Sequence, residues 1–295
     1  MNRIAPIKAI DLLLLFVVII WALNFTVIKA SLDEIGPHTF NALRFTLACT
    51  IIWIIIWNRG DWFTIPRHHI IPLISLGLFG NLVYQWLFII GIDYTFAANA
   101  AIILGTIPIW VAVSSHFFSL EKMTRLKGIG VTLAFIGVII IITGGGNQVT
   151  FGSDTFLGDL LIIAAAFVFG IYTVFSKHYL TYYSPIQFSG IMVSVGAASL
   201  ILLALPEMAS TNWSEISYAA YGGVIYSGAL AIGFAYLVWN YGLHKVGAVK
   251  TSTYQNLVPV LGLAFGVIIL NEQLSMVQYA GALVTVAGIV LTRKF

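Results

Sequence analysis

The side chains that could bind a small molecule are few, and they lie inside long apolar stretches of the chain. A polar side chain within a membrane span is costly, so each one is a candidate for a binding site. For each residue alone, helix packing or anchoring at the membrane interface stays open as the alternative. The candidate substrate cavity consists of Trp21, Asn24, Arg44, Asn81, Tyr84, Gln85, Asn99, Pro108, Tyr172, Tyr226, Tyr236, Lys250, Tyr254, Gln255 and Pro259.

Arg44 is the most demanding of these residues, because its guanidinium falls about eight residues into an apolar stretch. A charge at that depth must find carbonyls, a carboxylate, water or a bound solute. A structural ion pair and the recognition of an anion are equally open interpretations. Lys29 and Lys250 also lie in or near the apolar stretches.

The eleven acidic residues are placed differently, since all of them fall at or near the ends of these stretches: Asp11, Asp33, Glu34, Asp61, Asp93, Glu121, Asp154, Asp159, Glu207, Glu215 and Glu272. We therefore expect no carboxylate at the middle of the membrane, and none is singled out for proton exchange. A carrier of hydrophobic cations needs such a carboxylate as counter-ion. A neutral, zwitterionic or weakly anionic cargo is thus favoured over a quaternary ammonium compound.

Enzymatic chemistry has little support in the sequence. The six histidines form no H-E-x-x-H pair, and the chain has no G-x-S-x-G elbow and no P-loop. The single cysteine, Cys49, excludes a disulfide framework and a thiolate metal site. We expect no catalytic residue, no metal and no cofactor. A membrane-embedded enzyme and a channel remain distant alternatives to a carrier.

Membrane-spanning helices must position the candidate residues, because 60% of the 295 residues are hydrophobic and only 8% are charged. Charged residues make up about 25% of an ordinary soluble domain, so the composition excludes one. A net charge of +3 spread this thinly makes no nucleic-acid footprint. With about 20 residues per span, the pattern predicts an all-α integral membrane protein with ten helices, at 10–30, 37–57, 69–91, 95–119, 126–143, 157–177, 185–206, 215–241, 246–270 and 276–293.

Basic residues predict the orientation, since Lys and Arg in short loops stay on the cytoplasmic side. Two basic residues, Lys29 and Arg44, do not fall on the cytoplasmic side in the orientation given next. The N-terminal apolar run lacks a small-x-small cleavage site, so we interpret it as the first span of a multi-pass cell-membrane protein with both termini in the cytoplasm. Twelve of the fourteen basic residues then fall inside: Arg3, Lys8, Arg59, Arg67, Lys122, Arg125, Lys127, Lys177, Lys245, Lys250, Arg293 and Lys294.

The chain repeats itself at an offset near 150 residues. Five residues recur 151 positions later: Gly91 as Gly242, Pro108 as Pro259, Glu121 as Glu272, Gly130 as Gly281 and Gly137 as Gly288. Two more recur 148 positions later: Asp11 as Asp159 and Lys29 as Lys177. Repeats of five spans, an odd number, must run in opposite directions. We predict a first repeat at 9–143, a Gly-rich external linker at 144–156 and an inverted second repeat at 157–293.

Inverted repeats can exchange conformations, closing one side of the membrane as the other opens, with the binding site on interrupted helices at the midplane. The matching interruptions here are 105–108 and 256–259, each ending in a proline. Each proline removes one backbone hydrogen bond and frees a carbonyl, that of Leu104 or of Gln255. A kink that serves packing alone is the alternative, although the symmetric placement argues against it.

The sequence resembles the EamA-type family of the drug/metabolite transporter superfamily over nearly its whole length. The first half carries W-A-L-N-F at 21–25, L-R-F at 43–45 and A-A-N-A-A at 97–101. The second half carries G-D at 158–159 and L-N-E at 270–272, and the repeated residues given above complete the ordered set. One departure is Asn271, where the family pattern has Gly before Glu. The resemblance implies ten helices in two inverted five-helix repeats and, usually, export of metabolites or amino acids from bacterial cells.

Two repeated features have structural interpretations. Glu121 and Glu272 are expected to cap loops or pair with neighbours, rather than to couple ions. The glycines at seven-residue spacing allow close helix packing within the bundle, with a dimer contact as the alternative, through Gly130/Gly137 or Gly281/Gly288. We otherwise expect a monomer in the lipid bilayer.

The sequence therefore predicts an alternating-access exporter of a small neutral or zwitterionic metabolite, such as an amino acid or a derivative. A carrier of a weakly anionic metabolite or of an aromatic compound is the alternative.

Overall fold

The computed structural model describes residues 9–118, 124–143, 154–246, 251 and 254–294, and every regular element among them is a helix. Seven helices are long and apolar enough to cross a membrane, and three shorter apolar helices, at 128–141, 257–269 and 276–288, bring the set to ten. The prediction of an all-α membrane protein with ten spans is confirmed. Lys250 and Glu121 lie outside the described residues.

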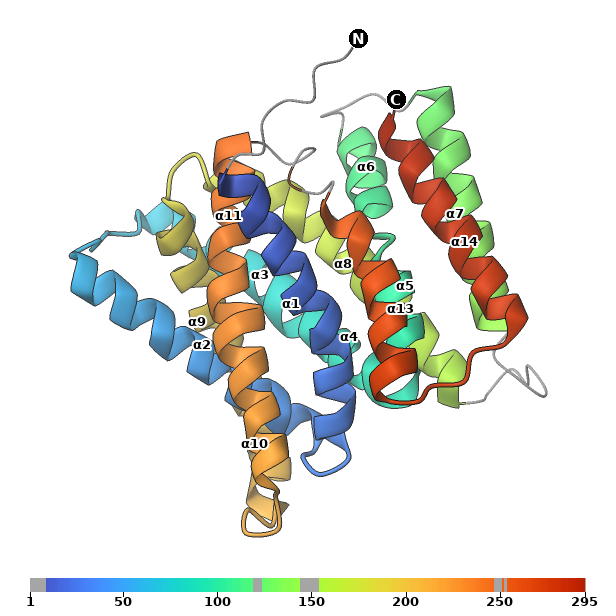
Figure 1. The fold of residues 1–295 in the computed structure, drawn as a ribbon. Coiled ribbons are helices and arrows are strands. Elements are labelled where there is room, and N and C mark those ends of the chain that lie inside the picture. Colours follow the sequence, from blue (N-terminus) through green and yellow to red (C-terminus); the bar gives the residue numbers. More distant parts are fainter. Residues whose placement is uncertain (1–8, 119–123, 144–153, 247–250, 252–253, 295) are drawn as a thin grey trace.

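The first five spans follow one another along the chain (Figure 1). The third is continuous but contains a π-helical segment, and the fourth is broken in the middle. Their elements are α1 (Ala9–Leu32), α2 (Pro37–Arg59), α3 (Arg67–Gly77), η1 (Leu78–Val83), α4 (Tyr84–Tyr94), α5 (Ala97–Leu104), α6 (Ile107–Phe117) and α7 (Arg125–Thr143).

The second five spans show one matching and one related irregularity. The eighth contains a π-helical segment, and in the described part of the ninth a short 3₁₀ turn directly precedes α13. Their elements are α8 (Asp154–Tyr179), α9 (Pro185–Ser210), α10 (Tyr218–Ile225), η2 (Tyr226–Phe234), α11 (Ala235–Val246), η3 (Tyr254–Asn256), α13 (Leu257–Ile269) and α14 (Met276–Lys294).

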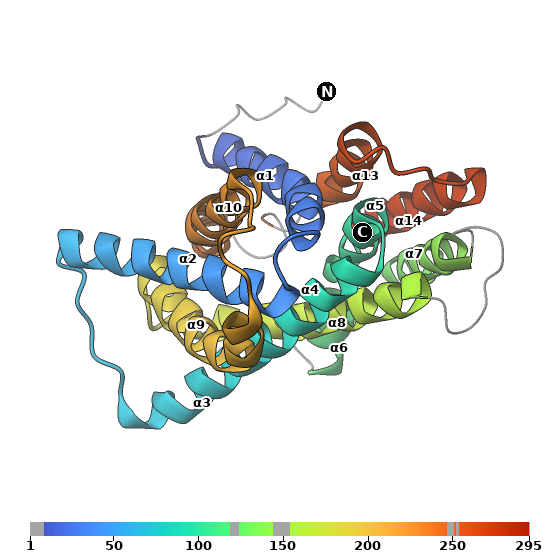
Figure 2. The same cartoon turned by 90° about the horizontal axis from the view of Figure 1, so that it is seen from below.

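The most extensive helix contacts join elements from different halves of the chain. α7 packs on α14, α2 on α9, α4 on α8 and α5 on α13. Seen along the bundle, α1, α4 and α8 lie between a group containing α2, α3 and α9 and a group containing α5, α7, α13 and α14 (Figure 2). The two halves therefore interleave instead of forming separate lobes.

Glycines bring α7 and α14 into direct backbone contact. A Cβ on Gly281 would lie 2.8 Å from the carbonyl oxygen of Gly137, and one on Gly288 would lie 2.7 Å from that of Gly130. The glycine faces thus pack on one another within the chain, as the bundle-packing interpretation requires. A dimer contact would need these faces to be free, and they are not.

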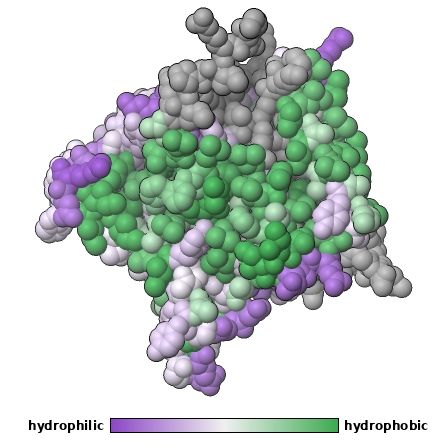
Figure 3. Space-filling model, in the orientation of Figure 1, coloured by the Kyte–Doolittle hydropathy of each residue, from purple (hydrophilic) through white to green (hydrophobic). Residues whose placement is uncertain are grey.

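The outside of the bundle is apolar, as a lipid-facing surface requires. Large side chains such as Ile71, Ile268 and Leu283 stay exposed there. Figure 3 shows a broad hydrophobic area over one face, with hydrophilic residues gathered toward its lower edge.

Carboxylates cap three helix N-termini on one face of the bundle, called the lower face from its place in Figure 1. Glu207 of α9 accepts from the Thr39 amide of α2, at 2.7 Å. Glu34 accepts from the Ser217 amide before α10, at 2.7 Å, and from its hydroxyl, at 2.8 Å. Glu272, after α13, accepts from the first amides of α5, Ala97 at 2.6 Å and Ala98 at 3.0 Å. Each contact joins the two halves, and Glu272 has the capping role that we expected of it.

The α7–α14 contact leaves no room for a side chain, so Gly281→Val should destabilise the protein by about 1–3 kcal/mol through overpacking. Gly222→Val in α10 is the matched control, because a Cβ on Gly222 meets nothing within 4 Å. Both variants change Gly to Val in a helix, so the difference between their unfolding free energies isolates the packing. Equal stability of the two variants would contradict the contact.

The Glu34 cap should weaken in acid. Its hydrogen bonds to Ser217 hold the pKa of the Glu34 carboxyl below its usual value of 4.5. A lowered pKa in the folded state means that the stabilisation is present above pH 4.5 and is lost as the pH falls through the lowered pKa. The protection of the amides at the start of α10, measured as exchange relative to the intrinsic rate at each pH, should therefore fall in that acid range. Glu34→Gln should show faster exchange already at neutral pH, and identical exchange in both proteins would refute the cap.

Candidate functional site

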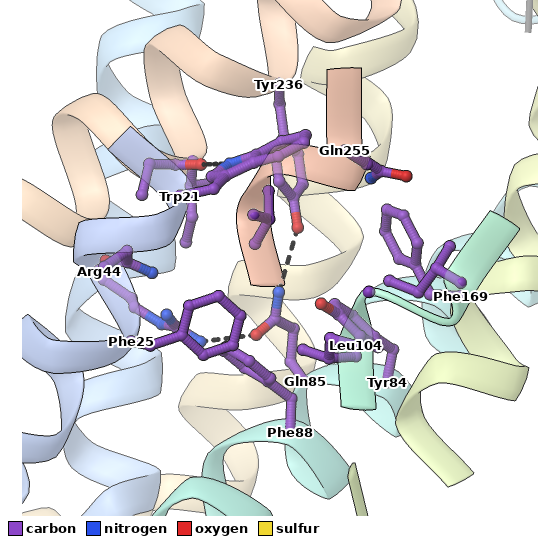
Figure 4. A pocket seen from close by; sticks show the side chains of 16 residues that line it. Trp21, Phe25, Arg44, Tyr84, Gln85, Phe88, Leu104, Phe169, Tyr236 and Gln255 are labelled. Carbon is purple, nitrogen blue, oxygen red and sulfur yellow. Dashed lines mark hydrogen bonds between the residues drawn. The ribbon is translucent and has the colours of Figure 1, made fainter. Parts of the chain in front are cut away.

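A cavity lies between helices of both halves (Figure 4). Its empty volume is about 640 Å³, which includes the part open to solvent. The walls come from α1, α2, α4, the α5–α6 break, α8, η2, α11 and the η3–α13 segment. Its lining residues are Trp21, Asn24, Phe25, Arg44, Tyr84, Gln85, Phe88, Leu104, Gly105, Ile107, Phe169, Ala231, Ile232, Tyr236, Gln255 and Val258.

Arg44 is held in the cavity wall by neutral hydrogen-bond acceptors. Its Nε donates to Asn41 at 2.8 Å, one terminal nitrogen donates to the Ser227 hydroxyl at 3.1 Å, and the other donates to the Gln85 side-chain oxygen at 2.6 Å. Gln85 in turn donates to the Tyr236 hydroxyl at 3.1 Å (Figure 4). The network connects α2, α4, η2 and α11, so it fixes the guanidinium from several sides.

The charge of Arg44 has no carboxylate partner among the described residues, although the side chain is 1% exposed. Three phenyl rings face it, with the guanidinium carbon 5.6 Å from the ring centres of Phe40 and Phe88 and 6.0 Å from that of Phe45. A guanidinium has five N–H donors, and three of them have partners here. The ion-pair interpretation is therefore wrong for the described residues, and the recognition of an anion stays a prediction.

Aromatic rings form most of the remaining wall. Tyr84 lies 4.7 Å from Phe169 and 5.7 Å from Phe88, and Phe88 lies 5.8 Å from Phe25, measured between ring centres. Across the cavity, the Trp21 indole donates to the Ala231 carbonyl at 2.9 Å. The site therefore combines one fixed positive group with a large apolar surface.

Seven of the fifteen predicted cavity residues line this cavity: Trp21, Asn24, Arg44, Tyr84, Gln85, Tyr236 and Gln255. Among them, the side-chain oxygen of Asn24 is buried and has no hydrogen-bond partner among the described residues. An unpaired buried acceptor is costly, so this oxygen is suited to a donor on a bound solute.

Tyr172 lines a smaller neighbouring cavity, which shares Trp21, Phe169 and Tyr236 with the main one. Asn81 is fully buried on η1 near the Tyr172 hydroxyl, and its amide has no partner of hydrogen-bond geometry among the described residues. Neither residue lines the main cavity.

Three predicted residues make structural contacts instead. The Tyr226 hydroxyl donates to the Ile20 carbonyl at 3.0 Å, and the Tyr254 hydroxyl donates to Asp11 at 2.6 Å. Asn99 lies on α5 and contacts Asp159. None of Tyr226, Tyr254 and Asn99 lines the cavity.

The two prolines mark the helix breaks that the sequence predicted. α5 ends at Leu104 and α6 begins at Ile107, which places Pro108 in the first turn of α6. Pro259 likewise lies in the first turn of α13, after η3. The two broken spans touch, since a Cβ on Gly105 would lie 2.1 Å from Pro259. The prolines thus shape the cavity wall without lining it, and Gly105, which does line it, permits the contact.

Sequence reasoning missed the phenylalanines and the π-helical segments. Phe25 and Phe88 line the cavity, but a phenylalanine in a span equally suits a lipid-facing position, so no signal separated them. η2 contributes Ser227, Ala231 and Ile232 to the Arg44 network and the wall. π-Helical segments often occur at functional sites, and no sequence motif marks them.

The sequence did not reveal the burial of one acid. Asp159 falls near the start of α8, as the sequence indicates, but its side chain is only 2% exposed and packs inside the bundle. Thr95 donates to it at 2.6 Å. Position along a helix therefore did not predict which face Asp159 occupies.

A ten-helix membrane bundle whose halves jointly enclose such a cavity defines a solute transporter. The model of the EamA-like transporter family matches residues 8–143 and again 156–294. The chain belongs to this family and is a transporter, not an enzyme.

Relatives agree with this assignment. The chain is 30% identical to an uncharacterized transporter of Archaeoglobus fulgidus over 290 residues, covering 95% of this chain and 96% of that one. It is 28% identical to the uncharacterized transporter YyaM of Bacillus subtilis, over 90% of this chain and 87% of the other. A protein of Streptantibioticus cattleyicolor named a probable terminal-alkyne amino-acid exporter is 25% identical, over 95% and 92%. A solved crystal structure shares the fold, with a TM-score of 0.70, 18% identity and 97% and 98% coverage.

The Arg44 network predicts that Gln85 stabilises the protein. Gln85→Leu removes the acceptor of a buried charge and should cost about 1–3 kcal/mol. Tyr236→Phe removes only the hydroxyl that accepts from Gln85, so it should cost about 1 kcal/mol or less. Unfolding free energies in detergent test this order, and a larger loss in Tyr236→Phe would contradict the role of Gln85.

Proposed function

We propose that this transporter exports a small metabolite that carries a carboxylate, such as an amino acid or a derivative, by alternating access. The observation that carries the proposal is the buried guanidinium of Arg44, which lines the cavity without a carboxylate partner among the described residues. A buried charge is costly when unpaired, and a bound carboxylate offsets that cost. Arginine also presents paired N–H groups that match a carboxylate.

The other groups of the cavity support the same cargo. Asn24 offers an unpaired oxygen to an amine or another donor on the solute. The rings of Phe25, Tyr84, Phe88 and Phe169 offer an apolar surface to its side chain. A zwitterion with an apolar part matches all three features of the cavity, namely the Arg44 charge, the Asn24 oxygen and the aromatic surface. A weakly anionic or aromatic carboxylate matches the first and the third. The name of the Streptantibioticus relative, a probable terminal-alkyne amino-acid exporter, supports the first of these.

Alternating access between inverted repeats is supported by contacts between equivalent residues. Gln85 and Tyr236, 151 positions apart, hydrogen bond to each other, which is expected of equivalent residues close to a two-fold axis. The glycine contacts are reciprocal as well, because the offset of 151 exchanges the Gly137–Gly281 contact with the Gly130–Gly288 contact. Both broken spans, four and nine, border the cavity, as in other repeat-built carriers.

The lower face is proposed to be the outer side of the cell membrane. The first described residues of α1 and the last of α14 both lie on the opposite, upper face of the bundle (Figure 1). Most basic residues fall on that side in the sequence, and such residues stay in the cytoplasm. Export then requires the cavity to open to the lower face.

Counterflow in proteoliposomes tests the proposal, with labelled L-phenylalanine and L-leucine as probes beside their amides and the matching amines. We expect saturable counterflow of at least one carboxylate, and none of the compounds that lack it. Arg44→Gln should raise KM at least about tenfold through loss of the charged partner. The KM of Arg44→Lys should lie between those of Arg44→Gln and the unmodified protein, because lysine keeps the positive charge but lacks the paired N–H groups of the guanidinium.

Arg67→Gln is the matched control, since it removes an exposed arginine far from the cavity lining and should leave KM unchanged. Equal KM values for Arg44→Gln and the unmodified protein would refute the carboxylate site. Flux that never saturates would instead identify a channel.

A further inference from the structure

Asp159 is a buried carboxyl group that the cavity does not use. It lies on α8, is 2% exposed, and is absent from the cavity lining. The Thr95 hydroxyl, in the α4–α5 turn, donates to Oδ1 at 2.6 Å. The Asn99 amide of α5 lies 3.5 Å and 3.4 Å from the two carboxyl oxygens. These partners are neutral.

The contact joins the two halves of the chain near the lower face. Asp159 belongs to the second half, whereas Thr95 and Asn99 belong to the first. Gln278 of α14 extends the cluster, since its amide donates to the Asn99 oxygen at 3.2 Å. The four residues Asp159, Thr95, Asn99 and Gln278 are called the gate cluster below. An opening of the lower face must separate them and expose Asp159 to water.

The charged groups around the gate cluster are engaged elsewhere, and the carboxylates of Asp33 and Asp93 lie beside Lys29. Lys29 of α1 donates to the carbonyls of Ile92 and Asp93, at 3.0 Å and 2.5 Å. Glu272 caps α5 through Ala97 and Ala98. The described basic residues and histidines of α3, α6, α7, α8 and α14 lie toward the opposite ends of their helices: Arg67, His68, His69, His116, Arg125, Lys127, Lys177, His178, Arg293 and Lys294. Among described residues, no cation forms an ion pair with Asp159.

Burial without a cation favours the neutral form of a carboxyl group, because desolvation penalises the charge. The neutral form also fits the contacts. A hydroxyl both donates and accepts hydrogen bonds. The short contact with Thr95 therefore persists when Asp159 is protonated, because the carboxyl group then donates a hydrogen bond to the Thr95 oxygen. Exposure to water removes the penalty and favours the ionised form.

The gate cluster is coupled to the cavity through two helices. Asn99 lies five residues before Leu104, which lines the cavity, a rise of about 7.5 Å along α5. Asp159 shares α8 with Phe169, another lining residue. A movement that opens the gate cluster therefore also moves two walls of the cavity.

We propose that Asp159 is a proton-binding residue of the outer gate, and that closure of this gate takes up one proton from the outer solution. Linkage is reciprocal: acid outside favours the closed gate, and opening releases the proton. The proposal rests on the proposed function for the identity of the lower face as the outer side.

Cysteine labelling from outside the cell measures the opening of the gate. Leu104→Cys on a Cys49→Ser background places a thiol in the cavity, and a membrane-impermeant maleimide reaches it only through an open outer gate. Tyr218→Cys, at a side chain 96% exposed on the lower face, corrects for the intrinsic pH dependence of thiol reactivity and reports the sidedness. The labelling rate relative to Tyr218→Cys should fall at least about fivefold from pH 8 to pH 5.

Asp159→Asn is permanently neutral, so its relative labelling rate should be low and should not change with pH. Asn99→Asp adds a second carboxyl beside Asp159 and favours the shared proton, so the midpoint should move to higher pH by about one unit or more. Glu215→Gln, which removes an exposed acid between α9 and α10, should behave as the unmodified protein.

A pH-independent labelling rate in the protein with intact Asp159 would overturn the proposal. An unchanged pH dependence in Asp159→Asn would overturn it as well. Saturable counterflow of a carboxylate together with flat labelling would retain the transport function and reject the proton site. Labelling that depends on Asp159, without any counterflow, would retain the proton site and reject the proposed transport function.

Discussion

The structure depends on burying one positive charge without giving it a negative partner among the described residues. Arg44 is 1% exposed, and its hydrogen bonds end on an amide, a hydroxyl and a second amide. Such a charge survives only if its surroundings hold it tightly. Two residues of η2 help to hold Arg44 in place. Ser227 supplies an acceptor, and a Cβ on Gly228 would lie 2.8 Å from the Arg44 carbonyl oxygen. Ser227 and Gly228 are therefore requirements of the site.

The site is asymmetric although the sequence repeats. α2 and α9 both begin with a proline, Pro37 and Pro185, 148 positions apart. At that offset Arg44 corresponds to Met192, which is equally buried but apolar. Gln85 corresponds at 151 to Tyr236, so two different side chains meet at equivalent positions. A repeat can thus supply a symmetric frame while a few substitutions give its cavity one charged wall.

The sequence predicted the number of spans and their breaks better than it predicted which residues line the cavity. Span number, the two helix breaks and the polar candidates on α1, α2 and α4 follow from hydropathy, proline and the cost of polar groups in lipid. Which face a residue occupies depends on lateral packing between distant segments. Tyr254 and Gln255 are neighbours, but Gln255 lines the cavity while Tyr254 contacts Asp11. The same limit hid the burial of Asp159, since depth along a helix does not reveal its neighbours.

The separation of Arg44 from Asp159 gives each group its chemical use. In contact, the two would form an ion pair, the guanidinium would lose its affinity for an outside carboxylate, and the carboxyl would stay ionised when buried. Instead, Arg44 faces the cavity from α2, and Asp159 faces Thr95 from α8. The elements between them, α4 and α5, contribute to the cavity wall and to the closure of the lower face alike. Under the two proposals, a change of charge at either group would act on the other through helix positions, which is the physical requirement for linking solute binding to the state of a gate.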